Sequence, residues 1–268
     1  MTIQEFKDKL VSKIAKNDNV MGIGQTGDLN APLIAGQSDI DMFVLCTEIP
    51  TQQEREEIYL PLSNDYSECM MAVCNGGIWG YGDILFFDGI DVMPMYFTIQ
   101  EMQEYLEQTL AGEHLYKEGR FYPVGRLASI EGLNVLFERD RAWSKLIDIV
   151  KARPQELFLK MYEFHIELVL DEEDLGRSVL RKEVLFYHQV VEEALDYLLQ
   201  ALFALNHTYF PSRKRMQQYL EHFQVKPVNC YERLLTIVEE AAHEDTIEQS
   251  VQHLRELTAE IKNLSFER

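Results

Sequence analysis

The chain has 268 residues, of which 46% are hydrophobic, and it contains only 14 Gly and 8 Pro. This composition supports one large core or two smaller ones and excludes a wholly disordered chain. The 25 Lys and Arg residues against 45 Asp and Glu residues give a formal net charge of -20, which disfavours binding to a long nucleic acid or an anionic membrane surface. The same charge would attract a small cationic molecule, although solubility alone also explains it.

Neither a membrane span nor a metal-binding cysteine motif is expected. No run of 18 apolar residues occurs, and the N-terminus lacks the continuous apolar core of a secretory signal. The four cysteines show no C-x-x-C pairing, so we expect free thiols and no zinc site. A cytoplasmic protein fits these features best.

The first half of the chain mixes strand and helix patterns. We expect helices at residues 3–16 and 99–110, and strands at residues 20–25, 40–46, 84–87, 90–97 and 135–137. Thr98 and Glu101 have the spacing of a capping box at the start of the second helix. Asp88 and Gly89 lie between two apolar runs and predict a tight hairpin, because Gly readily supplies the positive φ that such a turn needs.

The second half of the chain is helical in pattern. From Asp140 onward Gly176 is the only glycine, and apolar residues recur at helical spacing. The sequence therefore predicts an α+β protein, with a mixed sheet and flanking helices in residues 1–140 and an all-α helical bundle in residues 141–268.

Two carboxylates begin a predicted strand in the segment GDLNAPLIAGQSDIDMFVL. Asp39 and Asp41 project from the same face, because side chains alternate along a strand. Neighbouring carboxylates repel unless a cation lies between them, and Mg²⁺ prefers a few carboxylates together with oxygens of a substrate phosphate. Ser38 and the preceding loop amides could receive such phosphates. A polar turn followed by a solvated strand face explains the same residues without a ligand.

These residues resemble the motif of the nucleotidyltransferase superfamily with the polymerase beta-type fold. That motif is a hydrophobic residue, Gly and Gly or Ser, then about ten residues, then Asp-hydrophobic-Asp/Glu-hydrophobic. Here Gly27 and Asp28 fall at the first element, ten residues separate Asp28 from Asp39, and SDIDMFVL matches the second. The resemblance is close for residues 20–45 and looser elsewhere. It extends to small bacterial members with a C-terminal helical domain, including antibiotic nucleotidyltransferases of the aminoglycoside and lincosamide type and uncharacterised relatives.

The resemblance implies a function and a set of site residues. It implies a nucleotidyltransferase-like domain at residues 1–140 and a helical substrate-binding or interaction domain at residues 141–268. The implied reaction is the Mg²⁺-dependent (or Mn²⁺-dependent) transfer of a nucleoside monophosphate from a nucleoside triphosphate such as ATP to a hydroxyl of a small molecule. By analogy with the antibiotic-modifying members, the resemblance implies a cationic, aminoglycoside-like acceptor and a role in antibiotic resistance, with which the acidic composition is compatible. Asp39 and Asp41 would hold the metal, Asp91 would complete the catalytic set, and the nucleotide would be bound by Gly27, Asp28, Ser38 and Lys214.

Two positions depart from the family pattern. Asp28 stands where the family usually has Ser or Gly, and its carboxylate would repel the triphosphate of the nucleotide. Two like unit charges ~4 Å apart repel by ~4 kcal/mol at an effective dielectric of ~20. The family's third carboxylate aligns with Met93, whereas Asp91 lies two residues earlier on the same face. If Asp91 does not reach Asp39 and Asp41, the alternative is a catalytically degenerate relative, such as a binding or regulatory partner in a toxin–antitoxin pair. The sequence leaves both functions open, and the oligomeric state as well.

Three other features have two interpretations each. The basic cluster at residues 213–215 could contact phosphate or open a solvated helix. His188 and Glu192 share a helix face and could contact the acceptor, but packing is the simpler explanation of the histidine. The glycine-rich stretch around Trp79 is either a flexible lid or an ordinary surface turn.

Overall fold

The structure is a computed structural model that describes residues 1–62 and 69–266, and the chain divides into two compact units. Unit 1 consists of residues 1–108 and 129–152, and unit 2 consists of residues 109–128 and 153–268. The predicted boundary, between residues 140 and 141, falls inside the second segment of unit 1. That the two parts have separate functional roles stays a prediction.

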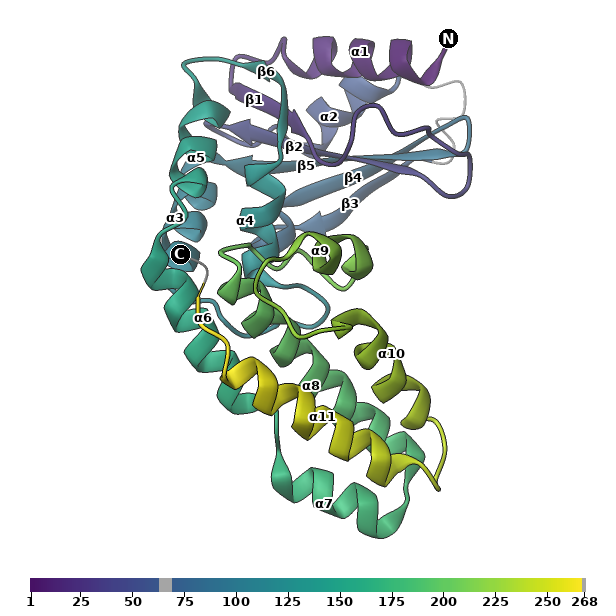
Figure 1. Cartoon of the computed structure of the whole chain (residues 1–268). Coiled ribbons are helices and arrows are strands. Elements are labelled where there is room, and N and C mark those ends of the chain that lie inside the picture. The colour runs from purple at the N-terminus through teal and green to yellow at the C-terminus, as the bar shows by residue number, and fades with distance from the viewer. Residues whose placement is uncertain (63–68, 267–268) are drawn as a thin grey trace. The chain divides into compact units, whose positions relative to one another are not determined.

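Unit 1 is built on a mixed β-sheet (Figure 1). The described residues form six strands in this sheet, in the spatial order β3-β4-β5-β2-β1-β6. β2 and β5 pair in parallel, and the other neighbours pair antiparallel. The strands are β1 (Val20–Gln25), β2 (Asp39–Cys46), β3 (Met70–Asn75), β4 (Tyr81–Phe87), β5 (Ile90–Thr98) and β6 (Asn134–Glu138).

Helices make up most of the rest of the described chain. Those before residue 152 are α1 (Ile3–Ile14), α2 (Gln52–Tyr59), α3 (Ile99–Leu110), α4 (Pro123–Glu131) and α5 (Ala142–Lys151), with a 3₁₀ turn at Gly77–Trp79. The later ones are α6 (Gln155–Leu168), α7 (Glu172–Arg181), α8 (Val184–Leu205), α9 (Met216–His222), α10 (Cys230–Glu240) and α11 (Ile247–Lys262). The sheet of unit 1 and the helices of unit 2 confirm the α+β class.

One face of the sheet packs on α1 and α2 (Figure 1). Ile40, Met42 and Val44 point to this face from β2 and pack in one core with Phe6 and Leu10 of α1. Burial of each apolar side chain of this kind stabilises the folded chain by about 1.5–3 kcal/mol relative to leaving it exposed. Because every second residue of β2 is committed to this core, Asp39 and Asp41 must project from the opposite face.

The opposite face packs on α5 and the turn that precedes β6. Two glycines of β1 make this close packing possible. A Cβ at Gly24 would lie 2.3 Å from Leu133 Cδ2, and a Cβ at Gly22 would lie 2.6 Å from Trp143 Cδ1. The Trp143 ring in turn lies 6.4 Å from the ring of Phe43, so this apolar packing begins directly after Asp41 along β2.

Several local predictions are confirmed. Asp88 and Gly89 form the turn between β4 and β5 with φ of 49° and 76°, and the Glu101 amide donates to Thr98 Oγ1 at 3.1 Å in the predicted capping box. The stretch around Trp79 is the connection between β3 and β4, and whether it acts as a lid stays a prediction. The sequence analysis did not predict β3, α2 or α4.

Unit 2 is a helical bundle arranged around α8. Helices α6, α7 and α11 contact α8, and α10 packs against α11. From Leu198 to Leu205 every residue of α8 is buried. None of the helices in the described ranges combines the length and the apolar character needed to cross a membrane.

A buried ion pair fixes α2 to the sheet. Arg55 of α2 donates to Asp83 of β4 through Nε at 2.7 Å and Nη2 at 3.1 Å. The Tyr59 hydroxyl donates to the same carboxylate at 3.0 Å, and burial raises the pKa of Tyr59 well above its usual value, which keeps this donor protonated. The amide of Ala72 in β3 also donates to Asp83. One carboxylate therefore ties α2, β3 and β4 together.

We predict that Asp83→Asn lowers the free energy of unfolding by about 3 kcal/mol, because it leaves the buried Arg55 guanidinium without a charged partner. Urea unfolding monitored by circular dichroism measures this change. Asp18→Asn is the matched control, since the Asp18 side chain is fully exposed, and it should leave stability within about 0.5 kcal/mol. A loss below about 1 kcal/mol for Asp83→Asn would contradict the anchoring role.

Candidate active site

The pairing of β2 with β5 brings three carboxylates together where these two central strands begin. In the parallel register Asp39 lies opposite Asp91, and Asp41 lies opposite Met93. Paired residues on neighbouring strands project from the same face, so all four side chains share the face opposite the α1 core. We call Asp39, Asp41 and Asp91, with Met93 at the fourth position, the acidic array.

The array has a defined spacing and is open to solvent. Adjacent strands lie ~4.8 Å apart, and residues i and i+2 are ~6.6 Å apart along a parallel strand. Asp39 is exposed, and Asp41, Asp91 and Met93 are half-buried. The array is therefore accessible to a ligand, while its backbone is held in the middle of the sheet by β1 on one side and β4 on the other.

The carboxylates are neighbours, but they do not form a complete metal cage. Within the described ranges, no group of three or more His, Cys, Asp and Glu side chains is arranged to hold a metal ion. Mg²⁺ commonly uses only one or two carboxylates and takes its other ligands from water and substrate phosphates. The residues present thus fit a cation that arrives with a polyphosphate, and they do not fit an all-protein cation site.

The loop before β2 is anchored where it leaves β1. The Thr26 amide donates to Asp41 O at 3.1 Å, and Asn134 Nδ2 donates to Gly27 O at 2.9 Å. The Asp28 carboxylate accepts the amide of Asn30 at 2.9 Å, which is an Asx turn. The contact that the structure gives Asp28 is therefore local, and its role in nucleotide binding stays a prediction.

The second half of the loop folds back onto the β4–β5 turn. The Gly36 amide donates to Gly89 O at 2.7 Å, and a Cβ at Gly89 would lie 2.9 Å from Ala35 Cβ. Ser38 Oγ accepts the amide of Ile34 at 2.9 Å. A hydroxyl that accepts in this way keeps its hydrogen for donation. Ser38 is thus held directly before Asp39 with a hydrogen-bond donor to offer.

The basic cluster belongs to unit 2, where the structure gives its members different environments. Arg213 donates through Nε to Asp196 Oδ1 at 2.5 Å, so it is committed to a buried carboxylate of α8. Lys214 is exposed, and its amide donates to Ser212 Oγ at 3.2 Å. Arg215 is also exposed and precedes α9 with a φ of 61°. A nucleotide contact by Lys214 stays a prediction.

Asp196 is the centre of a polar cluster that the sequence analysis missed. Lys117 Nζ lies 2.5 Å from Asp196 Oδ2, and the Tyr122 hydroxyl donates to Oδ1 at 2.6 Å. Burial alone would raise the pKa of Asp196, but the hydrogen bonds from Arg213, Lys117 and Tyr122 outweigh it and hold the pKa below its usual value. The sequence signal that could have identified this cluster is Asp196 itself, a single acidic residue within the apolar run ALDYLLQALFAL.

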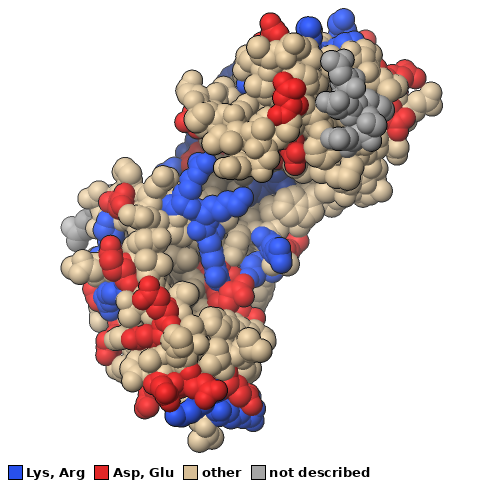
Figure 2. Space-filling view, turned by 90° about the vertical axis from the view of Figure 1, so that its right-hand side faces the viewer, with Lys and Arg blue, Asp and Glu red and all other residues tan. Residues whose placement is uncertain are grey.

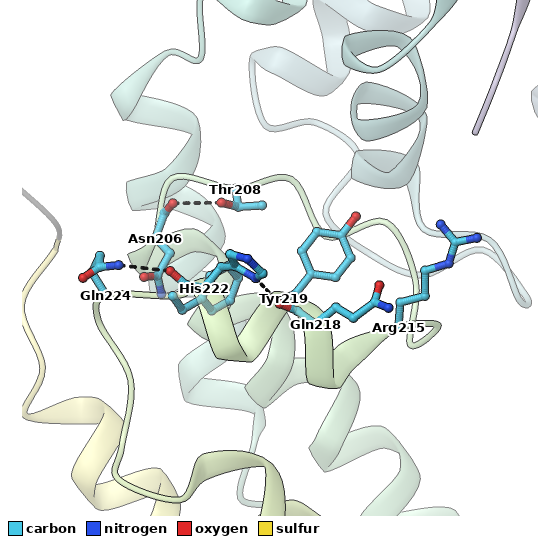
Figure 3. Close-up of a pocket in the computed structure, with 8 residues that line it drawn as sticks. Asn206, Thr208, Arg215, Gln218, Tyr219, His222 and Gln224 are labelled. Atoms are coloured by element: carbon cyan, nitrogen blue, oxygen red, sulfur yellow. Dashed lines mark hydrogen bonds between the residues drawn. The ribbon is translucent and has the colours of Figure 1, made fainter. Parts of the chain in front are cut away.

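Unit 2 also has a surface pocket beside α9 (Figure 3). Its volume is about 590 Å³, and Gln218, Tyr219 and His222 line it from one face of α9, together with Arg215 directly before the helix. Asn206 closes the other side with its amide bonded to the backbone of Leu202 and Val225. The α9 side chains can hydrogen-bond to a small polar molecule, and the sequence analysis did not predict this pocket.

The acceptor contacts suggested for His188 and Glu192 of α8 stay a prediction. Glu192 Oε1 lies 4.0 Å from Lys117 Nζ and is exposed. His188 is also exposed on α8, so the interpretation of His188 as a packing histidine is wrong. The spacing placed it correctly on the helix, but not on the buried side.

Two family models match parts of the chain. The model described as a YpoC-like protein matches residues 171–267, and the model described as a domain of unknown function (DUF4037) matches residues 121–216. Each covers less than half of the 268 residues, so neither assigns the whole chain to a family. No curated protein matches the sequence.

Two solved structures are similar to this chain. A nucleotidyltransferase-like protein from Exiguobacterium sibiricum 255-15 is 14% identical with a TM-score of 0.47, over 96% of this chain and 75% of that one. Spectinomycin adenyltransferase AAD(9) from Enterococcus faecialis, solved with ATP and spectinomycin, is 15% identical with a TM-score of 0.36, over 98% of this chain and 100% of that one. At these identities and TM-scores, neither similarity decides the function.

We predict that Asp196→Asn destabilises the chain by about 2–3 kcal/mol at pH 7, because hydrogen bonds to charged groups are lost. Since the folded pKa of Asp196 is depressed, its contribution is present above the unfolded-state pKa of about 3.9 and is lost as pH falls through the folded pKa. Urea unfolding at pH 7 and pH 3 measures both effects. The difference in free energy of unfolding between the wild type and Asp196→Asn should be smaller at pH 3 than at pH 7. An equal difference at the two pH values would contradict the stabilising role of the Asp196 carboxylate.

Proposed function

We propose that this protein is a nucleotidyltransferase that moves a nucleoside monophosphate from a nucleoside triphosphate to a hydroxyl of a small molecule. The observation that carries the proposal is the acidic array, in which Asp39, Asp41 and Asp91 share one solvent-accessible face at the ends of two parallel strands. The sequence motif in residues 20–45 supports the same reaction class. A solvated strand face would not require a third acid in register with the first.

The metal would be Mg²⁺ or Mn²⁺, held by Asp39 and Asp41 together with phosphate oxygens of the substrate. When bound, the ion would neutralise phosphate charge and orient the triphosphate. Ser38 would donate its hydroxyl hydrogen to a phosphate oxygen, and the Gly27 and Asp28 amides would face the same phosphates. These residues would bind and orient the nucleotide, and orienting the substrates is a main contribution of the protein to phosphoryl transfer.

Asp91 would act as the general base. Its carboxylate would take the proton of the acceptor hydroxyl as the acceptor oxygen bonds to the α-phosphorus. The bond from that phosphorus to the bridging oxygen of the β-phosphate would break, and pyrophosphate would leave. The roles of Asp39, Asp41 and Asp91 are thus distinct, although the three residues lie together where β2 and β5 begin.

The charge of the chain suggests the class of acceptor. The formal net charge is -20, and a net charge of this size attracts a cation and repels an anion. The face shown in Figure 2 carries scattered acidic side chains and also a compact group of Lys and Arg side chains, so the expected attraction of a cation follows from the net charge of the chain. We therefore propose a cationic hydroxyl compound, such as an aminoglycoside-like molecule, and with it a role in antibiotic resistance.

A second candidate is a binding-only relative that holds a nucleotide without transferring it. It is favoured by the position of Met93 opposite Asp41 and by the lack of a three-residue cation cage in the described ranges. In that case Mg²⁺ and nucleotide would stabilise the chain, but no pyrophosphate would be released with any acceptor. Turnover therefore separates the two functions.

We predict that Mg²⁺ with one of the four common nucleoside triphosphates stabilises the chain by about 2.7 kcal/mol at 100 times its dissociation constant. Thermal unfolding with each nucleotide, with Mg²⁺ or with EDTA, measures the effect. Asp41→Asn should abolish the Mg²⁺-dependent part, whereas Asp88→Asn, an exposed acid of the β4–β5 turn, should retain it. The absence of stabilisation by all four nucleotides would refute the proposal.

A further inference from the structure

Helix α7 has one packed side and one side exposed to solvent (Figure 1). It packs against α8 and α11, and its exposed face carries four residues at helical spacing, Glu173, Gly176, Arg177 and Leu180. Leu180 is 84% exposed, and Leu185, at the start of α8, is 87% exposed. These are the two most exposed large apolar side chains in the described ranges. Exposed apolar side chains alone do not require a partner, but three further features of this face indicate one.

The first feature is a glycine near the centre of the exposed face. Gly inside a helix lowers stability relative to most other residues, and Gly176 is the only glycine after Asp140. A Cβ at this position would meet no described atom within 4 Å, so packing within the chain does not require glycine here. Glycine lets a helix backbone come close to another surface. Gly176 therefore indicates a close approach from outside the chain.

The second feature is a groove beside this glycine. It lies between α7 and α11, has a volume of about 540 Å³, and is lined among others by Gly176, Val179, Leu180 and Val251. Leu180 lies one helical turn beyond Gly176 on the same face. The face thus presents an apolar side chain and, one turn away, a space that can receive such a side chain.

The third feature is the charge pattern along α7. Its first turn is acidic, with Glu172, Glu173 and Asp174, and its last turn carries Arg181. Arg181 is exposed and has no ion-pair partner among the described residues. Arg177 is neutralised within the helix by Glu173 and Asp174. The exposed face of α7 therefore has an acidic end and a basic end.

We infer that this face is a contact between two copies of the chain, with the two α7 helices antiparallel about a two-fold axis at the level of Ser178. Gly176 and Leu180 are each two positions from Ser178, so Leu180 of each copy lies over Gly176 of the other. The acidic first turn of each copy lies beside Arg181 of the other. A parallel pairing would instead set acid against acid.

A second copy fits this face because a two-fold contact requires a self-complementary surface. The apolar side chain, the space that receives it and both signs of charge are all present on one helix. One helix from each copy makes a small interface, and two chains of formal net charge -20 repel each other. We therefore expect a weak, reversible dimer. The inference goes beyond the proposed function and does not depend on it.

The test is sedimentation equilibrium of the full-length chain over a concentration series in the micromolar range. Glu173→Lys and Arg181→Glu each reverse one charge, so each variant alone sets like charges against each other at both symmetric contacts. An equimolar mixture of the two variants restores opposite charges at both contacts of a heterodimer. The matched controls, Glu104→Lys and Arg120→Glu, make the same charge changes at exposed positions outside α7.

The inference predicts a wild-type dimer, a loss and a rescue. Each charge variant should weaken the dimer about tenfold or more, and the mixture should return to within about threefold of the wild type. Leu180→Gln should weaken it about tenfold or more, and the controls should leave it unchanged. A wild type that is monomeric at every concentration would overturn the inference, and the face would then fit a different protein. Dimerisation that survives Leu180→Gln, or a mixture without recovery, would also overturn it.

Gly176→Gln separates the contact from the fold. Gln favours a helix more than Gly does, and the Cβ of Gln has room at this position. The variant should therefore raise the midpoint of thermal unfolding of the monomer while it weakens the dimer, whereas a misfolded variant would lower that midpoint. A Gly176→Gln chain that dimerises as tightly as the wild type would overturn the inference. Circular dichroism confirms that each variant is folded before its association is compared.

Discussion

The parallel hydrogen-bonded ladder between β2 and β5 is the constraint on which the candidate site depends. It sets Asp39 opposite Asp91 and fixes the face from which both project. The apolar residues between the acids, Ile40 and Met42, are buried in the α1 core, so a slip of one residue would expose them and bury the acids. Hydrophobic burial on one face therefore determines where the carboxylates lie on the other.

Buried carboxylates with cationic partners stabilise both units. In unit 1 Asp83 joins α2 to β3 and β4. In unit 2 Asp196 joins α8 to the segments that carry Lys117, Tyr122 and Arg213. Both acids are satisfied by several donors, which is the condition under which a buried charge is tolerated. The acids of the array are different, because they lie at an accessible position where β2 and β5 begin and no three of them converge as a cation site among the described residues.

The sequence predicted the α+β class, β2 and the β4–β5 turn, because strand alternation and Asp-Gly turn chemistry are local signals. It did not predict α2, whose segment QQEREEIY has no apolar stripe and buries mainly Arg55 and Tyr59. It also left the position of Asp91 open, since strand register depends on the packing of both strands and is not visible in either one. The Asp196 cluster joins residues 117, 122 and 213, and no local pattern connects such distant positions.

The most direct measurement is anomalous diffraction from crystals of the full-length chain soaked with Mn²⁺ and an α,β-methylene nucleoside triphosphate. The account predicts Mn²⁺ density within coordination distance of Asp39 and of at least one other carboxylate of the acidic array, next to the triphosphate. Nucleotide or Mn²⁺ density elsewhere, with Asp39 making no contact to the ion, would contradict it.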